Sequence, residues 1–313
     1  MSRKGRRGGK KRSYTLWIIL VLVVVTGVVG YYIFTSSGAA AGNPLDGTPV
    51  PQTVLSELAN VSTATLNQVG SGPSTVVSPK STTSTAATST SPALFNGKPE
   101  VLYIGAEYCP FCAAERWAMI VALDKFGNFT GTEYMQSAPA PEASPNTATF
   151  TFKDATYSSK YISFVSFEQL DRNHAALQTP DANSTALMNK YDSAGSIPFV
   201  DFANEYTLTG SQYTPPVIAN ANWTQIASQL NTPSSVYALN IDAAANRIIS
   251  IICKIDGGAP TSLCSQGLAQ TASYIRPSTS SASQLLVSDA LMSGPSPSAS
   301  ATRFAPTRLT DWV

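Results

Sequence analysis

Residues 101–126 read VLYIGAEYCPFCAAERWAMIVALDKF, and this stretch decides the fold class of the chain. Its first four residues form a short apolar run that is typical of a buried strand. After the two cysteines, apolar side chains recur at helical spacing and predict a helix over residues 113–126. The side chains expected in the core are Trp117, Ile120, Val121 and Leu123. The stretch therefore predicts a strand that leads into a helix, with a CPFC motif at the junction.

The position of Cys109 and Cys112 at the start of this helix has a chemical consequence. A helix amino terminus presents unpaired N–H groups and the positive end of the helix dipole, which stabilise a thiolate on Cys109 and lower its pKa. Cys112 lies one turn further and is expected to be more buried. Pro110 occupies an early helical position, where its missing N–H costs no hydrogen bond. The motif is thus a candidate redox dithiol.

A zinc site and a structural bridge are two other interpretations of the cysteines. A zinc site would need Cys253 and Cys264 as well, and ten intervening residues is not a usual ligand spacing. A purely structural bridge between Cys109 and Cys112 would close too short a loop to stabilise the fold much. His174, the one histidine of the sequence, is expected in a solvated loop. Glu107 could accept a proton, but a surface carboxylate is the simpler expectation. No metal is predicted.

A second element supports the dithiol. Residues 194–198 read AGSIP and precede two short apolar segments at 199–203 and 206–210, which predict a β-hairpin that follows a proline. Strand, CPFC helix and proline-led hairpin together resemble the thioredoxin superfamily. The resemblance implies an α/β fold with a central mixed sheet flanked by helices. It also implies that Pro198 is a cis-proline beside the cysteines.

The same resemblance assigns roles to the residues around the motif. The backbone of Ile197 would be offered to an extended substrate peptide, and Tyr108 and Phe111 would contact substrate next to the cysteines. Tyr108 stands where thioredoxins usually have tryptophan. Residues 154–171 are expected to be a β insertion relative to that fold. The resemblance thus names Cys109, Cys112 and Pro198 as catalytic residues.

Four stretches narrow the resemblance further. Together they are similar to the uncharacterised, largely prokaryotic family catalogued as domain of unknown function 929. The four stretches read VLYIGAEYCPFCAAERWAMIVALDKFGNF, YSSKYISFVSFEQLD, GSIPFVDFANEY and IICKIDGGAPTSLC. The resemblance extends from about Gly42 to Ile275. It implies a membrane anchor and a fold, and it brings no established reaction.

The second cysteine pair follows a predicted helix over residues 243–255. A disulfide between Cys253 and Cys264 would stabilise the fold by about 3 kcal/mol in the chain-entropy model. A structural bridge is the simpler interpretation. The alternative is a relay pair that exchanges electrons with Cys109 and Cys112 through mixed disulfides.

The amino terminus predicts a membrane anchor. Seven of the 20 basic residues lie in the first 12 positions, and residues 16–34 contain no charge. A helix of that length covers about 28 Å, which spans a bilayer, and the positive-inside rule places residues 1–13 in the cytoplasm. A cleaved signal peptide, with small residues at 38–41, is the alternative. Both alternatives leave the domain outside the cytoplasm. With a retained anchor, the domain is attached to the cell membrane by a single transmembrane pass.

Composition divides the 313-residue chain into five segments. We expect a basic tail (1–13), a transmembrane helix (14–35) and a Ser/Thr/Pro-rich stalk (36–93) with a short helical segment at 51–67. A thioredoxin-like domain follows (94–276), and then a Ser/Pro-rich tail (277–313). Beyond residue 12 the chain carries 13 basic and 19 acidic residues, a formal −6, which argues against a nucleic-acid partner.

These observations predict a membrane-anchored thiol-disulfide oxidoreductase. Its partners would be thiols or disulfides of secreted or membrane proteins, together with a membrane redox partner. No organic cofactor is expected, because a partner dithiol supplies the electrons. The sequence contains no P-loop, GxGxxG, HExxH or nucleophile-elbow motif. The alternative is a non-catalytic thioredoxin-like scaffold whose disulfides are structural.

Overall fold

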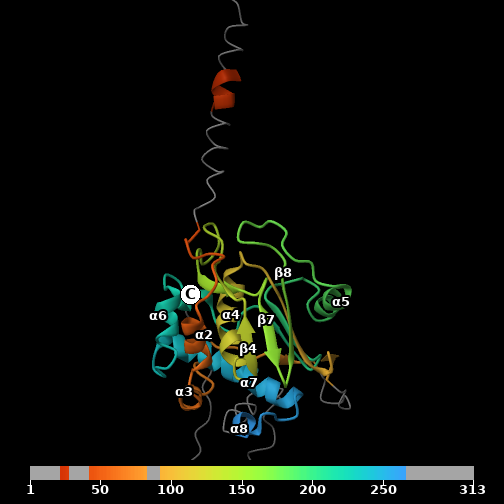
Figure 1. Cartoon of the computed structure of the whole chain (residues 1–313). Coiled ribbons are helices and arrows are strands. Elements are labelled where there is room, and N and C mark those ends of the chain that lie inside the picture. The colour runs from red at the N-terminus through yellow and green to blue at the C-terminus, as the bar shows by residue number, and fades with distance from the viewer. Residues whose placement is uncertain (1–21, 28–41, 83–91, 266–313) are drawn as a thin grey trace, which may run out of the picture. The chain divides into compact units, whose positions relative to one another are not determined.

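A computed structural model describes residues 22–27, 42–82 and 92–265 of the chain, and Figure 1 shows the arrangement of its elements. The centre is a six-stranded mixed sheet. β3 (Lys98–Gly105) pairs in parallel with β8 (Ser163–Glu168) and antiparallel with β9 (Phe199–Phe202). β10 (Tyr206–Thr209) continues the sheet beside β9, and β1 (Lys80–Ser81) closes that edge. A short β2 (Leu94–Phe95) forms a hairpin with the start of β3.

The apolar run of β3 is buried on both faces, as expected for a strand that helices cover on either side. Val101 and Tyr103 face the larger core cluster, while Leu102 and Ile104 face a smaller one. The larger cluster holds α4 (Pro110–Leu123) and α7 (Ala243–Ile255), and the smaller one includes Met188 of α5 (Ala182–Tyr191). The sheet therefore lies between two helical layers.

Two small antiparallel sheets and several short helices complete the domain. β4 (Gly127–Thr130) pairs with β7 (Thr156–Ser159), and β5 (Glu133–Gln136) pairs with β6 (Ala148–Thr151). The remaining short helices are η1 (Pro215–Val217), α6 (Trp223–Ala227), η2 (Ala238–Asp242) and α8 (Thr261–Cys264).

Local predictions from the 101–126 stretch are confirmed. The strand forms at 98–105, and Trp117, Ile120, Val121 and Leu123 are all fully buried. The helix begins at Pro110 rather than at residue 113, because Cys109 caps it. The hairpin after Pro198 is also present, as β9 and β10.

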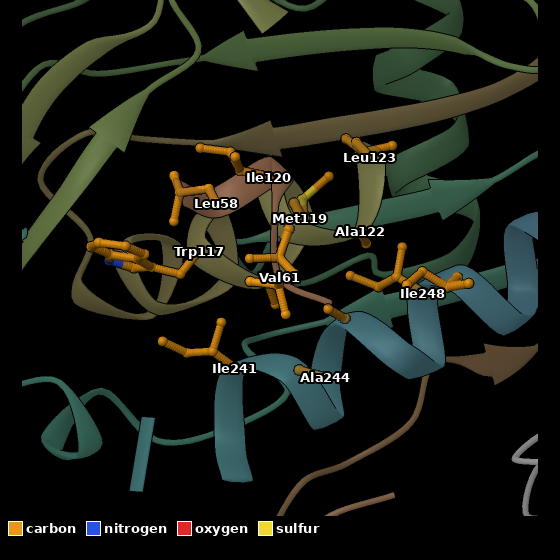
Figure 2. Close-up of a cluster of buried hydrophobic side chains, with 14 of the residues drawn as sticks. Leu58, Val61, Trp117, Met119, Ile120, Ala122, Leu123, Ile241, Ala244 and Ile248 are labelled. Atoms are coloured by element: carbon orange, nitrogen blue, oxygen red, sulfur yellow. The ribbon is translucent and has the colours of Figure 1, made fainter. Parts of the chain in front are cut away.

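The expectation of a stalk over residues 36–93 is wrong for residues 42–82. The helical segment expected at 51–67 forms two helices, α2 (Gln52–Ala59) and α3 (Thr63–Val69), and Leu58 and Leu66 are fully buried. Figure 2 shows Leu58 and Val61 among side chains of α4 and α7. Lys125 fixes this segment further, since its Nζ donates to Ala59 O and to Val61 O at 2.7 Å each. The folded unit therefore begins near residue 42 rather than at 94.

The expectation that residues 154–171 form an insertion is also wrong. β8 lies within this range and is the parallel partner of β3 over six residue pairs, from Glu100 with Ser163 to Gly105 with Glu168. This strand is thus central to the sheet. Its sequence, SFVSFE, did not distinguish a strand of the central sheet from an inserted hairpin.

Several predicted segments lie outside the described residues. These are the basic tail, the carboxy-terminal tail, residues 36–41 and 83–91 of the predicted stalk, residues 266–276 of the predicted domain, and all of the predicted membrane helix except residues 22–27, which are helical. Within the described ranges, no helix combines the length and apolar character needed to cross a bilayer.

The packing of α2 generates a test. Leu58→Ala should lower the free energy of unfolding by about 2–5 kcal/mol, because it removes a fully buried side chain and leaves a cavity. Urea unfolding followed by circular dichroism measures the change. Leu45→Ala is the matched control: Leu45 is 43% exposed in the same segment, so its change should stay within about 0.5 kcal/mol. Equally small changes in the free energy of unfolding for both variants would indicate that residues 42–82 form a stalk and do not pack on the domain.

Candidate functional site

The two cysteines of the CPFC motif are free thiols at the amino terminus of α4. Cys109 is the cap residue, and its Sγ accepts the backbone N–H of Cys112 at 3.3 Å. Pro110 follows as the first helical residue. Cys109 is 5% exposed and Cys112 is fully buried, so the expected order of accessibility is observed. The sulfur that reaches the surface is therefore the one that the helix terminus stabilises.

The surroundings separate the pKa values of the two thiols. A hydrogen bond from the Cys112 side chain lowers the pKa of Cys109, and the Cys112 N–H and the charge of Arg116 act in the same direction against the effect of burial. Burial raises the pKa of Cys112 well above its ordinary value, and the neighbouring Cys109 adds to this. The pair is thus divided into a thiolate-forming cysteine and one that keeps its proton.

The loop before β9 lies against Cys109. The Ile197–Pro198 peptide bond is cis, as the resemblance implied, and the Cys109 thiol donates to Ile197 O at 3.9 Å. Asp192 holds the preceding turn, since its carboxylate accepts the N–H groups of Ala194 and Ser196 at 3.2 and 2.8 Å. Segments that are 88 residues apart therefore meet at one sulfur.

A cleft of about 370 Å³ opens beside this junction. Ala106, Tyr108 and Ile197 form its wall next to the dithiol, and residues between 169 and 180 form the other side together with Gly195. Tyr108 and Ile197 thus lie where substrate contacts were expected. Phe111 does not line the cleft; it is 41% exposed on the surface of the motif.

Arg116 is a site residue that the sequence did not reveal. It lies one turn after Cys112, is fully buried, and forms a bidentate ion pair with Glu168, at 2.9 Å from Nε to Oε1 and 2.7 Å from Nη2 to Oε2. Nη2 also donates to Ala106 O at 2.7 Å. Burial is the largest single effect and acts to lower the pKa of Arg116, but the charge and hydrogen bond of Glu168, together with the nearby Tyr103 and Cys112, raise this pKa well above its usual range. A permanent positive charge therefore lies beneath the dithiol.

Glu107 is not the surface carboxylate that was expected from the sequence. It is 4% exposed, and its Oε1 accepts a hydrogen bond from Thr151 Oγ1 at 2.7 Å. Burial raises the pKa of Glu107, and the nearby charge of Glu168 raises it further. Thr151 lies 44 residues away on β6, so only the tertiary structure could reveal this environment.

His174 lies in an exposed turn, as predicted, but it also contacts the site. Its ring is 4.1 Å from the ring of Tyr108, measured between centroids, and its Nε2 is 3.9 Å from Glu142 Oε1. The Asp171 carboxylate shapes the turn by accepting the N–H groups of Asn173 and Ala175 at 2.8 Å each. The turn thus extends the aromatic edge of the cleft.

The second cysteine pair forms a disulfide between Cys253 and Cys264. The neighbouring Lys254 places its Nζ 5.4 Å from the ring centroid of Tyr206. Tyr206 pairs with Phe202, which pairs with Val101 of β3, and the remaining length of β3 to Gly105 is about 13 Å. The disulfide therefore lies toward the end of the sheet opposite the CPFC motif.

This separation bears on the alternatives considered for the cysteines. The two pairs are not brought together, either as a relay or as a four-cysteine zinc site. In the described part of the chain, no group of three or more His, Cys, Asp or Glu residues is arranged to hold a metal ion.

The separated pKa values generate a test by alkylation of the reduced full chain. Iodoacetamide should modify Cys109 at least about tenfold faster than Cys112 at pH 7. Because only the thiolate reacts, the rate at Cys109 should rise with pH through a midpoint below the ordinary thiol value of 9.0. Mass-resolved peptide mapping measures both rates. A midpoint at or above that value, or equal rates at the two cysteines, would contradict the assignment.

The buried ion pair generates a second test. Arg116→Gln should destabilise the fold by about 3–5 kcal/mol, since it leaves Glu168 buried without its partner. It should also raise the pKa of Cys109, whereas Arg116→Lys should retain part of both effects. Lys153→Gln is the control, because the Lys153–Asp154 pair is exposed and should contribute about 0–1 kcal/mol. Urea unfolding and the pH profile of alkylation measure the two effects.

Comparison with known proteins adds one finding. No curated protein matches the chain, and no solved structure matches it. A family model does match: over residues 85–191, about a third of the chain, the sequence is similar to the family described as Domain of unknown function (DUF929). That range contains β3, the CPFC motif, α4, β8 and α5, so the resemblance to this family is confirmed over the half of the site that carries Cys109, Cys112 and Arg116.

Proposed function

We propose that this chain is a membrane-anchored, extracytoplasmic thiol-disulfide oxidoreductase that acts by dithiol exchange through Cys109 and Cys112. The observation that carries the proposal is the setting of the Cys109 sulfur. It accepts the Cys112 N–H at the helix terminus and lies 3.9 Å from Ile197 O at the edge of an open cleft. A structural cysteine needs neither a stabilised thiolate nor a cleft beside it.

We infer further that the fold is thioredoxin-like. The chain path β3, α4, β8, α5, β9, β10, α7 and the strand order β8-β3-β9-β10 support this inference. The position of Pro198 directly before β9 agrees with it.

The proposed reaction follows from the separated thiols. The Cys109 thiolate attacks one sulfur of a substrate disulfide, the substrate S–S bond breaks, and the departing sulfur takes up a proton. Cys112 then loses its proton and attacks Cys109 Sγ, which releases the substrate as a dithiol and leaves a Cys109–Cys112 disulfide. Two electrons pass to the substrate. The reverse sequence oxidises a substrate dithiol, and a membrane redox partner restores the starting state.

The compartment is part of the proposal. A disulfide such as Cys253–Cys264 persists in oxidising environments outside the cytoplasm. Residues 16–34 would anchor the chain by a single pass with the amino terminus in the cytoplasm. The substrates would then be thiols or disulfides of secreted or membrane proteins, with no organic cofactor and no nucleic acid involved.

The reduction potential of the Cys109–Cys112 pair tests the proposal. Equilibration of the full chain with thiol buffers, followed by mass-resolved alkylation, measures it while Cys253 and Cys264 are monitored separately. A potential above about −230 mV is expected for an oxidant or isomerase, and one near −270 mV for a reductant. A bridge that resists reduction below about −300 mV would favour the non-catalytic scaffold.

Serine variants supply a prediction for each thiol. Cys109→Ser should lower the exchange rate by about two orders of magnitude or more, because the attacking sulfur is lost. Cys112→Ser should accumulate a mixed disulfide, visible as an added substrate mass. The double variant Cys253→Ser/Cys264→Ser is the control, and it should lose stability while it keeps exchange. Exchange that survives in Cys109→Ser would exclude the proposed nucleophile.

A further inference from the structure

The cleft beside Cys109 carries no charge of its own. None of its nine lining residues ionises at neutral pH. Its polar side-chain groups are the amides of Gln169 and Gln178 and the hydroxyls of Thr179 and Tyr108, and the remaining lining is apolar or glycine. The Gln178 amide is already engaged, accepting from Glu168 N–H at 2.8 Å and donating to Lys153 O at 2.9 Å. No lining side chain could therefore form an ion pair with a carboxylate of a bound substrate.

The charged groups at the edge of the cleft are mainly acidic. Asp171 follows the lining residue Leu170, and Asp192 accepts hydrogen bonds from the turn that contains Gly195. Glu142 lies beside His174, whose ring packs at a tilt against that of Tyr108. Three carboxylates thus belong to three different segments that adjoin the lining residues. An anionic substrate would approach against their combined field.

The cations near the site do not offset this field. Lys153, whose backbone O accepts a hydrogen bond from Gln178, has its Nζ paired with Asp154 Oδ2 at 3.1 Å. Arg116 is paired with Glu168, and both side chains are fully buried. Arg172 is 7% exposed, lies 3.7 Å from Asp46 Oδ2 and donates from Nε to Ser137 O at 3.1 Å. Each guanidinium is therefore held by groups of the protein itself, and neither is a lining residue of the cleft.

We propose that the substrate of this dithiol is a disulfide or thiol within a neutral or basic polypeptide segment, and that glutathione and other anionic small thiols are discriminated against. The inference rests on the proposed function and narrows it to a substrate class. An extended polypeptide offers amides and side chains that suit an uncharged cleft of mixed polarity. Glutathione carries carboxylates that find no cation in the lining.

Matched disulfides test this with the reduced full chain. Glutathione disulfide is compared with the ester in which its glycine carboxylates are blocked, so that the sulfurs are the same and the charge differs. Three peptide disulfides of one sequence, with glutamine, lysine or glutamate flanking the cysteine, form a second series. Stopped-flow measurement of Cys109 oxidation gives each rate constant. The neutral and lysine peptides and the ester should react about tenfold faster than their anionic counterparts at low salt.

A variant pair locates the effect in the cleft. Thr179→Lys adds a cation at an exposed lining position, and Thr179→Gln adds length without charge. Thr179→Lys should raise the ratio of the rate with glutathione disulfide to the rate with the ester several-fold, whereas Thr179→Gln should leave this ratio at its wild-type value.

The outcomes separate the two proposals. If glutathione disulfide reacts as fast as its ester and the three peptides react alike, the substrate class is wrong while the exchange function stands. If the reduced chain reacts with none of these disulfides, nor with uncharged hydroxyethyl disulfide, the proposed function itself fails. Faster reaction with glutathione disulfide and the glutamate peptide than with their neutral counterparts would show that the cleft prefers anionic substrates.

Discussion

The buried guanidinium of Arg116 is the constraint on which the site depends. It joins three elements. Arg116 belongs to α4, and its guanidinium donates to the Glu168 carboxylate at the end of β8 and to Ala106 O directly after β3. An isolated buried charge costs several kcal/mol, so the side chain is stable only when these partners hold their positions. The height of the helix terminus above the sheet, and with it the position of the dithiol, is fixed by the same contacts.

Much of this architecture was predictable because its signals are local. The apolar run of β3, the helical spacing of α4 and α7, and the proline before the β9–β10 hairpin each lie within a few consecutive residues. The chemistry of the CPFC motif is local too, since the helix terminus that stabilises Cys109 is formed by the next three residues. The disulfide followed from simple pairing of the remaining cysteines.

The features that escaped prediction depend on distant pairs. Arg116 and Glu168 are 52 residues apart, and Glu107 and Thr151 are 44 apart, so neither burial is visible in a short window. The helical segment at 51–67 was predicted from its apolar spacing but was placed in a stalk, and only the surface of α4 and α7 explains why Leu58 and Leu66 are buried. Charged side chains in a helix normally indicate a solvent-exposed face, whereas Arg116 lies on a buried face of α4.

The docking of α3 on α7 ties together the two ends of the folded unit. The Asn246 side chain donates to Leu66 O and Gly70 O at 2.8 and 2.7 Å, across about 180 residues. During synthesis from the amino terminus, residues 42–82 emerge first, and α3 has no surface to cover until α7 follows. The CPFC cysteines emerge between these two segments, so both thiols are synthesised before the core that buries Cys112 is complete.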